Sequence, residues 1–395
     1  MTQQWSQSES SAVPHGAEDG RRWWPIAAVT ASVIASCYGF GRYAYGLFAP
    51  DIADHFAMSA TAIGVVGGAS TLGYTVGLLL APRLTAMLSA RAAVVLASGI
   101  ASTGLSLAGV SGDWLPVFVI GLLTAGVGAG LVSPGVAQLI ARSVATGPRS
   151  RAQTWANTGT SLGLAVSSFA PALVFGWQVT WLGFGAAAAL VTALAWRTLP
   201  RAAEGDGIGR SGEGWRRPGL TLLLVNSVLL GFTSAPYWNF SVDQVQRAGV
   251  DPGVSGWFWL VIGVAGPIGG VVGALAKRLT LTTVNVATWM LWSAAIALLA
   301  VPGLSLQFAL ISAGAFGAAF MGLTGLCILW AAKLYPASPA RGVTLSFLAL
   351  GVGQTLGSIA TGLFADQTGL STAFVVAAGL GMTMWVQVHP RLRVQ

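Results

Sequence analysis

Residues 39–48 read GFGRYAYGLF, and they lie inside an apolar run that extends from about residue 25 to residue 49. Their first six letters fit the G-x-G-x-x-A pattern of a dinucleotide-binding turn. That pattern binds phosphate only where a strand precedes it and a helix begins in it. Because one long apolar stretch precedes it here, the segment instead predicts a membrane helix with a single arginine, Arg42, inside it.

The composition of the chain points to a membrane protein. Of 395 residues, 54% are hydrophobic and 8% are charged, against roughly 25% charged in a soluble domain. Stretches of about 20 apolar residues can cross a bilayer as helices, and none of these alternates with the period of two that a membrane barrel shows. We expect an all-α membrane protein with twelve spans, near 25–49, 61–82, 92–111, 115–141, 152–175, 177–197, 219–242, 254–276, 283–301, 305–332, 342–364 and 370–388.

The basic residues predict the topology of these spans. Of the 20 lysines and arginines, all but two fall before the first span, after the last, or in alternate connections between them. The exceptions are Arg247, on the opposite side, and Arg42, inside a span. Positively charged loops stay in the cytoplasm, so we expect both termini and the central loop there. The excess of arginine over lysine favours a bacterial source, and hence a multi-pass protein of the inner membrane.

A repeat divides the chain into two halves. At a spacing of 192 residues, Gly39, Phe40, Tyr45, Phe48 and Asp51 correspond to Gly231, Phe232, Tyr237, Phe240 and Asp243. Between the halves lies RAAEGDGIGRSGEGWRRPG, residues 201–219, whose polar, glycine-rich composition is typical of a linker. We therefore expect a disordered cytoplasmic tail (1–22), an N-terminal six-helix bundle (23–199), a cytoplasmic linker (200–217), a C-terminal six-helix bundle (218–388) and a cytoplasmic tail (389–395).

Two parallel six-helix repeats are the arrangement of alternating-access transporters. Over nearly all of residues 25–388 the chain resembles the major facilitator superfamily, and GFGRYAYGLF resembles the first helix of a little-characterised bacterial subgroup with G-x-G-R-[FY]-A-Y-G. The resemblance implies two pseudo-symmetric six-helix bundles, with helices 1, 4, 7 and 10 lining a central cavity. It also implies secondary transport of a small-molecule substrate.

Three departures from the patterns of that family count against exchange of drugs for protons. Ala81 stands where the loop after helix 2 usually has an aspartate. Leu122 replaces the arginine found in helix 4 of many proton-linked exporters, and Leu164 follows a glycine where a proline is usual in helix 5. The fold implied by the resemblance is not affected by these changes.

Arg42 is the only charge inside a span, since all 12 acids lie in tails, in loops or at helix ends. Asp51 is nine residues away, roughly 13 Å along a helix, too far for a pair within one turn. Ionisable groups within a membrane face the bundle interior or a watery cavity, and a guanidinium suits two oxygens of a carboxylate or phosphate. We expect Arg42 to bind an anionic group of the substrate. The alternative is a structural role on helix carbonyls and nearby tyrosines.

Several other side chains are candidates for the same site. Tyr38, Arg42 and Tyr45 are spaced i, i+4 and i+7, which places them on one stripe of an α-helix. The remaining candidates for substrate binding are Tyr74, Tyr237, Trp238, Asn239 and Gln354. For these, packing and aromatic anchoring at the membrane interface are the alternatives. Asp51 and Asp243 are candidates for coupling to a proton or sodium gradient, with solvated loop carboxylates as the alternative.

We predict a secondary transporter of a small organic solute, with Arg42 favouring an anion, acting as a monomer in the lipid bilayer. The alternatives are an exporter of hydrophobic or aromatic compounds, with Arg42 structural, and a membrane sensor without transport. The sequence shows no nucleophile, base or metal set and no P-loop, so we expect no enzyme, cofactor or metal. The basic residues form no concentrated patch, and we expect no nucleic-acid partner.

Overall fold

A computed structural model describes residues 23–173, 176–201 and 217–388, and every regular element in these ranges is a helix. The first half contains α1 (Trp23–Ile34), η2 (Ala35–Tyr43), α2 (Tyr45–Phe56), α3 (Ala60–Met87), α4 (Ala90–Gly109), α5 (Leu115–Ser143), α6 (Arg149–Asn157), α7 (Gly159–Ser167), η3 (Ala170–Leu173) and α8 (Trp177–Thr198). The second half contains α9 (Leu220–Arg247), η4 (Pro252–Val254), α10 (Ser255–Ala265), η5 (Gly266–Gly270), α11 (Val271–Arg278), α12 (Leu281–Leu299), α13 (Leu306–Leu334), α14 (Pro339–Thr368), α15 (Leu370–Met382) and η6 (Thr383–Val388). The all-α membrane fold expected from the sequence is confirmed.

Eleven helical stretches among the described residues are long and apolar enough to cross a membrane. The expected span at 152–175 differs, because the chain there forms α6, α7 and η3 in succession. The α6 sequence, RSRAQTWAN, is polar, and at its end the Thr158 hydroxyl donates to the Trp155 carbonyl (2.7 Å). Such bonds from a hydroxyl to its own helix favour a bend. The expected tails, and all but three residues of the linker, lie outside the described residues.

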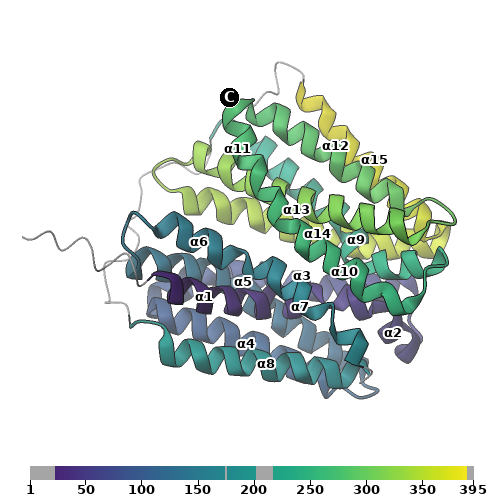
Figure 1. Ribbon diagram of the computed structural model, residues 1–395, viewed down its shortest axis with the longest axis horizontal. Helices are drawn as coiled ribbons and strands as arrows, with labels where there is room; N and C mark the ends of the chain where they lie inside the picture. Colours follow the sequence, from purple (N-terminus) through teal and green to yellow (C-terminus); the bar gives the residue numbers. More distant parts are fainter. Residues whose placement is uncertain (1–22, 174–175, 202–216, 389–395) are drawn as a thin grey trace, which may run out of the picture.

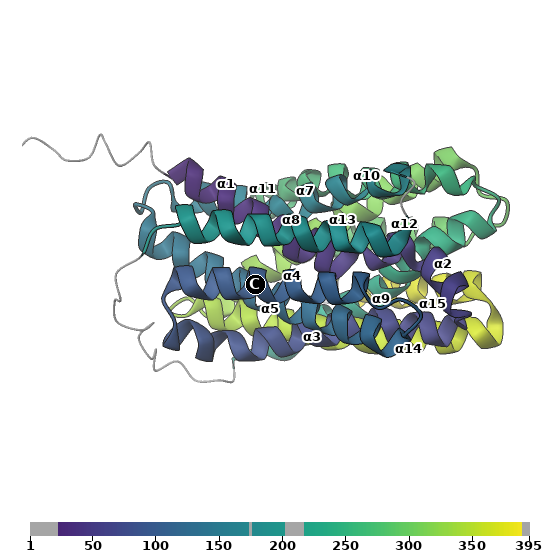
Figure 2. The ribbon, with the colours of Figure 1, turned by 90° about the horizontal axis from the view of Figure 1, so that it is seen from below.

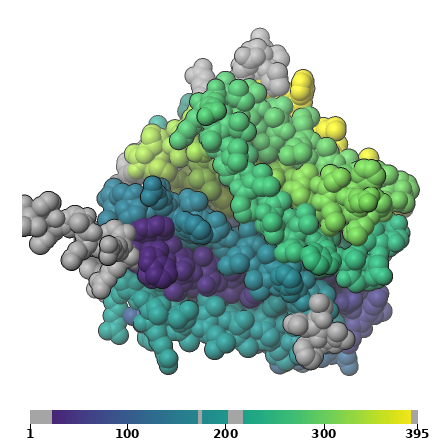
Figure 3. Space-filling model, viewed as in Figure 1, coloured from purple at the N-terminus to yellow at the C-terminus, as the bar shows by residue number. Residues whose placement is uncertain are grey.

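The helices run roughly along the long axis of the molecule in two packed groups (Figures 1 and 2). Elements α1 to α8, coloured purple to teal, form one group, and α9 to η6, green to yellow, form the other. In the space-filling view the two colour groups meet along an oblique seam (Figure 3). The interface between the groups consequently joins residues far apart in the sequence.

Glycines bring helices of the first group into close contact. Gly73 and Gly77 of α3 lie against the backbone of α5, and Gly126 and Gly130 of α5 lie against the backbone of α3. A Cβ at any of the four would collide with main-chain atoms. The small-x-x-x-small pairs in the sequence therefore serve helix packing here.

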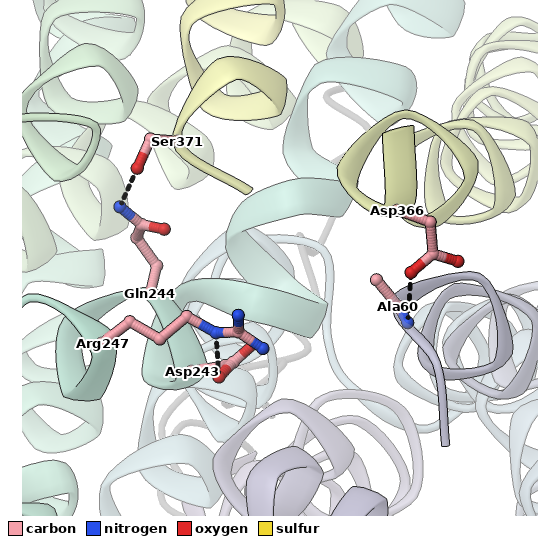
Figure 4. A network of polar contacts seen from close by, with 6 residues as sticks. All are labelled: Ala60, Asp243, Gln244, Arg247, Asp366 and Ser371. Carbon is pink, nitrogen blue, oxygen red and sulfur yellow. Dashed lines mark hydrogen bonds and ion pairs between the residues drawn. The ribbon is translucent and has the colours of Figure 1, made fainter. Parts of the chain in front are cut away.

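The two groups touch mainly at one end of the molecule, which we call the closed end and which carries α2, the start of α3 and the end of α14. The main contacts between the groups join α3 to α14, α7 to α10 and α2 to α9. At the closed end the Asp366 carboxylate accepts hydrogen bonds from the backbone N–H groups of Ala60 and Thr61, both at 2.9 Å (Figure 4). The Thr61 hydroxyl donates to the same carboxylate (2.6 Å). Asp366 thus caps the N-terminus of a helix in the other half.

At the opposite end the helices pack within their own halves. Element α6 packs on α1, α5 and α7, and α11 packs on α12, α13 and η5. The described chain begins at this end with α1, and α8 and α9 flank the linker there (Figure 2). The halves are consequently fastened to each other at the closed end.

Candidate functional site

Arg42 lies in η2, a π-helix of nine residues that interrupts the first membrane helix between α1 and α2. A π-helix bonds i to i+5, so residues five apart come onto one face, and such segments are frequent at functional sites. Gly39 in η2 lies against the backbone of Gly163 in α7, where a Cβ would collide with main-chain atoms. The wider helical turn therefore packs tightly against its neighbour.

The π-helix changes which tyrosines accompany Arg42. Tyr38 and Tyr43, five residues apart, lie beside each other with ring centroids 6.3 Å apart. Tyr45 instead donates its hydroxyl to the Ile63 carbonyl (3.1 Å). The expected stripe of Tyr38, Arg42 and Tyr45 is therefore wrong, because it assumed α-helical spacing throughout. Tyr43, which is not among the residues predicted from the sequence, takes the place of Tyr45.

The Arg42 guanidinium is enclosed by aromatic rings and one amide. Its Cζ lies 3.7 Å from the ring centroid of Tyr74, 5.0 Å from that of Tyr43 and 5.5 Å from that of Tyr38. Its Nη2 donates to Oε1 of Gln354 (2.8 Å), on α14 in the other half. The side chain is only 5% exposed. Cation–π attraction and this hydrogen bond together hold the charge at the joint between the halves.

Two buried polar atoms of Arg42 and the tyrosines around it have no hydrogen-bond partner among the described residues. They are Nε of Arg42 and the hydroxyl of Tyr74. Buried polar groups are nearly always hydrogen-bonded, and an unpaired donor costs about 1–3 kcal/mol. The two atoms can bind an acceptor such as a carboxylate oxygen, which the cluster itself does not supply.

The cluster extends into both halves through Tyr38 and Tyr43. The Tyr38 hydroxyl is 2.9 Å from Oγ of Ser133 on α5. The Tyr43 ring stacks on Trp238 of α9, with centroids 4.2 Å apart. Trp238 in turn meets Phe316 and Phe320 of α13, both at 5.2 Å between ring centroids. We call Arg42, Tyr38, Tyr43, Tyr74, Trp238 and Gln354 the Arg42 cluster.

The structure places the other predicted site residues elsewhere. Tyr237 is fully buried inside the second half, where its hydroxyl is 2.8 Å from Oγ of Ser312 and its ring stacks on Phe316. Asn239 donates to Oγ of Ser358 on α14 (2.7 Å), and its amide lies against Gly67 of α3. Asn239 thus lies at the interface of the halves, whereas Tyr237 is part of the core of one half.

The two acids expected to couple an ion do not lie in the Arg42 cluster. Asp243 accepts a hydrogen bond from Nε of Arg247, four residues later on α9 (2.8 Å; Figure 4). Asp51 is exposed on α2 at the closed end. Among the described residues, no group of three or more histidines, cysteines, aspartates or glutamates could hold a metal ion.

The fold and the buried site together define the class of this protein. The chain is a bundle of membrane-spanning helices in two halves, and a buried charge with free hydrogen-bonding capacity lies where the halves meet. These features are those of a membrane transporter. The family model described as "Uncharacterised MFS-type transporter YbfB" matches residues 34–388, and the chain belongs to this family of the major facilitator superfamily.

Solved transporter structures share the fold. The chain is similar to the xylose transporter XylE from E. coli in its inward-open conformation, with a TM-score of 0.75 at 14% identity over 93% of this chain and 96% of that one. It is similar to a bacterial homologue of the human lysosomal transporter Spinster in its inward-facing and occupied conformation, with a TM-score of 0.74 at 15% identity over 94% of this chain and 99% of that one. It is also similar to the nucleoside transporter NupG, with a TM-score of 0.70 at 15% identity over 93% of this chain and 99% of that one.

No curated protein sequence matches the chain. The matching family is one of transporters, so the protein is a transporter and not an enzyme. At 13–15% identity the solved structures establish the fold alone. Its substrate must therefore be argued from the side chains of this chain.

Proposed function

We propose that the protein is a secondary transporter that moves a small organic anion by alternating access, with Arg42 binding the anionic group. The observation that carries the proposal is the buried guanidinium whose Nε has no partner among the described residues. A charged group at membrane depth is expensive unless it is paired, and the described acids lie at the closed end of the molecule. A carboxylate on the substrate would supply the missing counter-charge.

The position of the cluster supports coupling between binding and movement of the halves. Arg42, Tyr38, Tyr43 and Tyr74 belong to the first half, whereas Gln354 and Trp238 belong to the second. An anion on Arg42 competes with the Gln354 amide for the N–H donors of the guanidinium. Binding therefore changes the equilibrium between the conformation in which this bond links the halves and one in which it is broken. A ligand can shift such an equilibrium only by binding the two states differently.

The charge pattern of the connections supports an orientation in the membrane. If the basic connections are cytoplasmic, the closed end faces the other side of the membrane and this conformation opens toward the cytoplasm. We propose that the protein lies in a bacterial inner membrane as a monomer with both termini cytoplasmic, within the subgroup marked by G-x-G-R-[FY]-A-Y-G. Drive by a proton or sodium gradient through Asp51 and Asp243 stays a prediction.

A second candidate function is export of hydrophobic or aromatic compounds. It is favoured by the aromatic group beside Arg42, in which Tyr43 stacks on Trp238 and Phe320 meets both rings edge-on, because such a group can pack against an aromatic solute. In that case Arg42 would be structural, held by Gln354 and the rings of three tyrosines. The two functions differ in the solute they require, since the first needs an anionic group and the second does not.

The test is a thermal-stability screen of the purified full-length protein with acetate, succinate and benzoate, each beside an uncharged or amine analogue. A ligand that binds the folded state raises the melting temperature. We expect a carboxylate to raise the melting temperature of the wild type, to raise that of Arg42→Lys by a smaller amount, and to leave that of Arg42→Gln unchanged. Uptake of the same radiolabelled carboxylate into proteoliposomes should follow this order, and binding without uptake would instead indicate a sensor.

Tyr237→Phe is the matched control, because it removes a buried hydroxyl outside the cluster. Size-exclusion profiles and circular dichroism check that each variant is folded. The proposal is refuted if Arg42→Gln keeps wild-type transport of the substrate found, or if benzamide stabilises the protein as well as benzoate does.

A further inference from the structure

A groove of about 540 Å³ runs between α4 and α8, on the outer side of the first half and outside the Arg42 cluster. The two helices lie side by side in both ribbon views (Figures 1 and 2). Small residues form much of its wall, namely Gly99 of α4 with Ala189 and Ala193 of α8. Trp196 and Arg197 line it where α8 ends. No residue of the Arg42 cluster lines this groove.

The hydroxyl groups in the groove are already bonded to the helices. Ser102 donates to the Gly185 carbonyl across the two helices (2.9 Å). Thr103 donates to the Gly99 carbonyl (3.0 Å) and Thr192 to the Ala188 carbonyl (2.7 Å), each within its own helix. The wall therefore presents mostly carbon atoms to whatever fills it, as a hydrocarbon chain requires.

One end of the groove is cationic. Arg91, at the start of α4, is only 8% exposed, stacks over the Trp196 ring at 4.6 Å and donates to the Trp196 carbonyl. Its Nε has no hydrogen-bond partner among the described residues. Arg197 beside it is exposed. Arg197 thus lines the end of an apolar groove, and Arg91 stacks on its neighbour Trp196, which lines the same end.

The described acids of the first half cannot neutralise these arginines. Asp51 and Asp54 lie on α2 at the closed end, and Asp113 pairs there with His55 (3.0 Å). Arg91 begins α4 and Arg197 is near the end of α8, so both lie at the opposite end of the molecule. An anion at this end of the groove would therefore be attracted without competition from those carboxylates.

The groove and the arginine beside it together span about one leaflet. The lining residues of α4, from Val95 to Thr103, rise roughly 12 Å at 1.5 Å per residue, and Arg91 lies about 6 Å further toward the start of the helix. Half of the hydrocarbon thickness of a bilayer is about 15 Å. A headgroup at Arg91 and Arg197 would thus place an acyl chain along Gly99 and reach Thr103. The exposed ring of Trp196 marks the same level, because tryptophan favours the membrane interface.

We propose that this groove binds an anionic phospholipid of the surrounding membrane, with one acyl chain between α4 and α8 and the phosphate on Arg91 and Arg197. Only 28% of the most apolar window of α8 is buried by protein, the smallest share among the candidate spans. A bound acyl chain would cover more of this helix. Charge complementarity selects the anionic lipid over a zwitterionic one.

Native mass spectrometry of the full-length protein tests the proposal, with dioleoyl phosphatidylglycerol and dioleoyl phosphatidylcholine as probes. We expect a bound phosphatidylglycerol on the wild type and little phosphatidylcholine. Arg197→Gln should weaken phosphatidylglycerol binding about fivefold, the effect of one basic residue near an anionic lipid surface. Gly99→Leu should abolish it, since a Cβ there meets only Thr192 Cγ2 at 3.9 Å and the longer side chain fills the groove.

Matched controls lie outside the groove. Gly183→Leu adds the same side chain to α8 at an exposed position with no atom within 4 Å of its Cβ. Arg151→Gln removes an exposed arginine from α6. Both should bind phosphatidylglycerol as the wild type does. Equal binding of the two lipids by the wild type, or unchanged binding by folded Gly99→Leu and Arg197→Gln, would overturn the proposal.

Discussion

Asp366→Ala is expected to loosen the closed end. Its carboxylate accepts three hydrogen bonds from Ala60 and Thr61, at 2.6–2.9 Å, and it is the side chain of one half capping a helix of the other. When the halves separate, the same groups bond to water instead. The variant therefore loses only the difference in free energy between the bonds to Asp366 and the bonds to water.

The size of the effect follows from the exposure of the site. Loss of a helix N-cap costs about 0.5–2 kcal/mol, and a carboxylate at a helix N-terminus contributes roughly 0.3–1 kcal/mol. Because Asp366 is exposed and screened by water, we take about 1 kcal/mol in total. The ratio of open to closed molecules at this end should then rise about fivefold. Thr61→Val, which keeps both N–H bonds, should have a smaller effect in the same direction.

Pulsed electron paramagnetic resonance measures this ratio. Nitroxide labels at Asp54→Cys and Gln367→Cys, exposed positions in different halves, report the opening in a background with Cys37→Ala and Cys327→Ala. Asp113→Ala is the control, because it removes an exposed aspartate that pairs with His55 within the first half. If Asp366→Ala and Asp113→Ala gave the same distance distribution as the parent, the capping argument would be refuted.

Three further outcomes follow from the contacts. Gly67→Val should also open the closed end, because its Cβ would meet the Asn239 amide of the other half; an unchanged distance distribution would contradict this. Tyr237→Phe should lower the free energy of unfolding by about 1 kcal/mol, seen as a lower melting temperature, while transport persists; loss of transport in a folded variant would place Tyr237 in the site. Arg247→Gln should lower the free energy of unfolding by less than about 1 kcal/mol in a thermal melt, since water screens the exposed Arg247 side chain; a larger loss would contradict this.

The spans could be predicted from the sequence because hydropathy is a local property that adds along the chain. Expected limits such as 61–82 and 115–141 fall inside α3 and α5 as the structure has them. The interrupted span at 152–175 was not foreseen, since average hydropathy does not register the polar α6 or the hydroxyl of Thr158. Composition predicts that a segment enters the membrane, and not how regular its helix is.

Part of the Arg42 cluster could be anticipated from the sequence. Arg42 stood out as the lone charge inside an expected span. Tyr38, Tyr74 and Gln354 contact it, and Trp238 stacks on Tyr43 beside it. Tyr43 was missed, because its place depends on a π-helix that no sequence period indicated. Asp366 was counted only as an acid at a helix end; its partners are 305 and 306 residues away.

What the sequence alone determined is the membrane environment, the approximate positions of the helical spans, the repeat in the sequence, and Arg42 as a charge inside an expected span. The first, second and fourth of these follow from the hydropathy and charge of side chains, and the repeat follows from comparing the two halves of the sequence. None of the four depends on how the helices pack. The partners of that charge were decided by the tertiary structure, because Gln354 is 312 residues from Arg42 and meets it only when α14 packs on α3 at the joint of the halves.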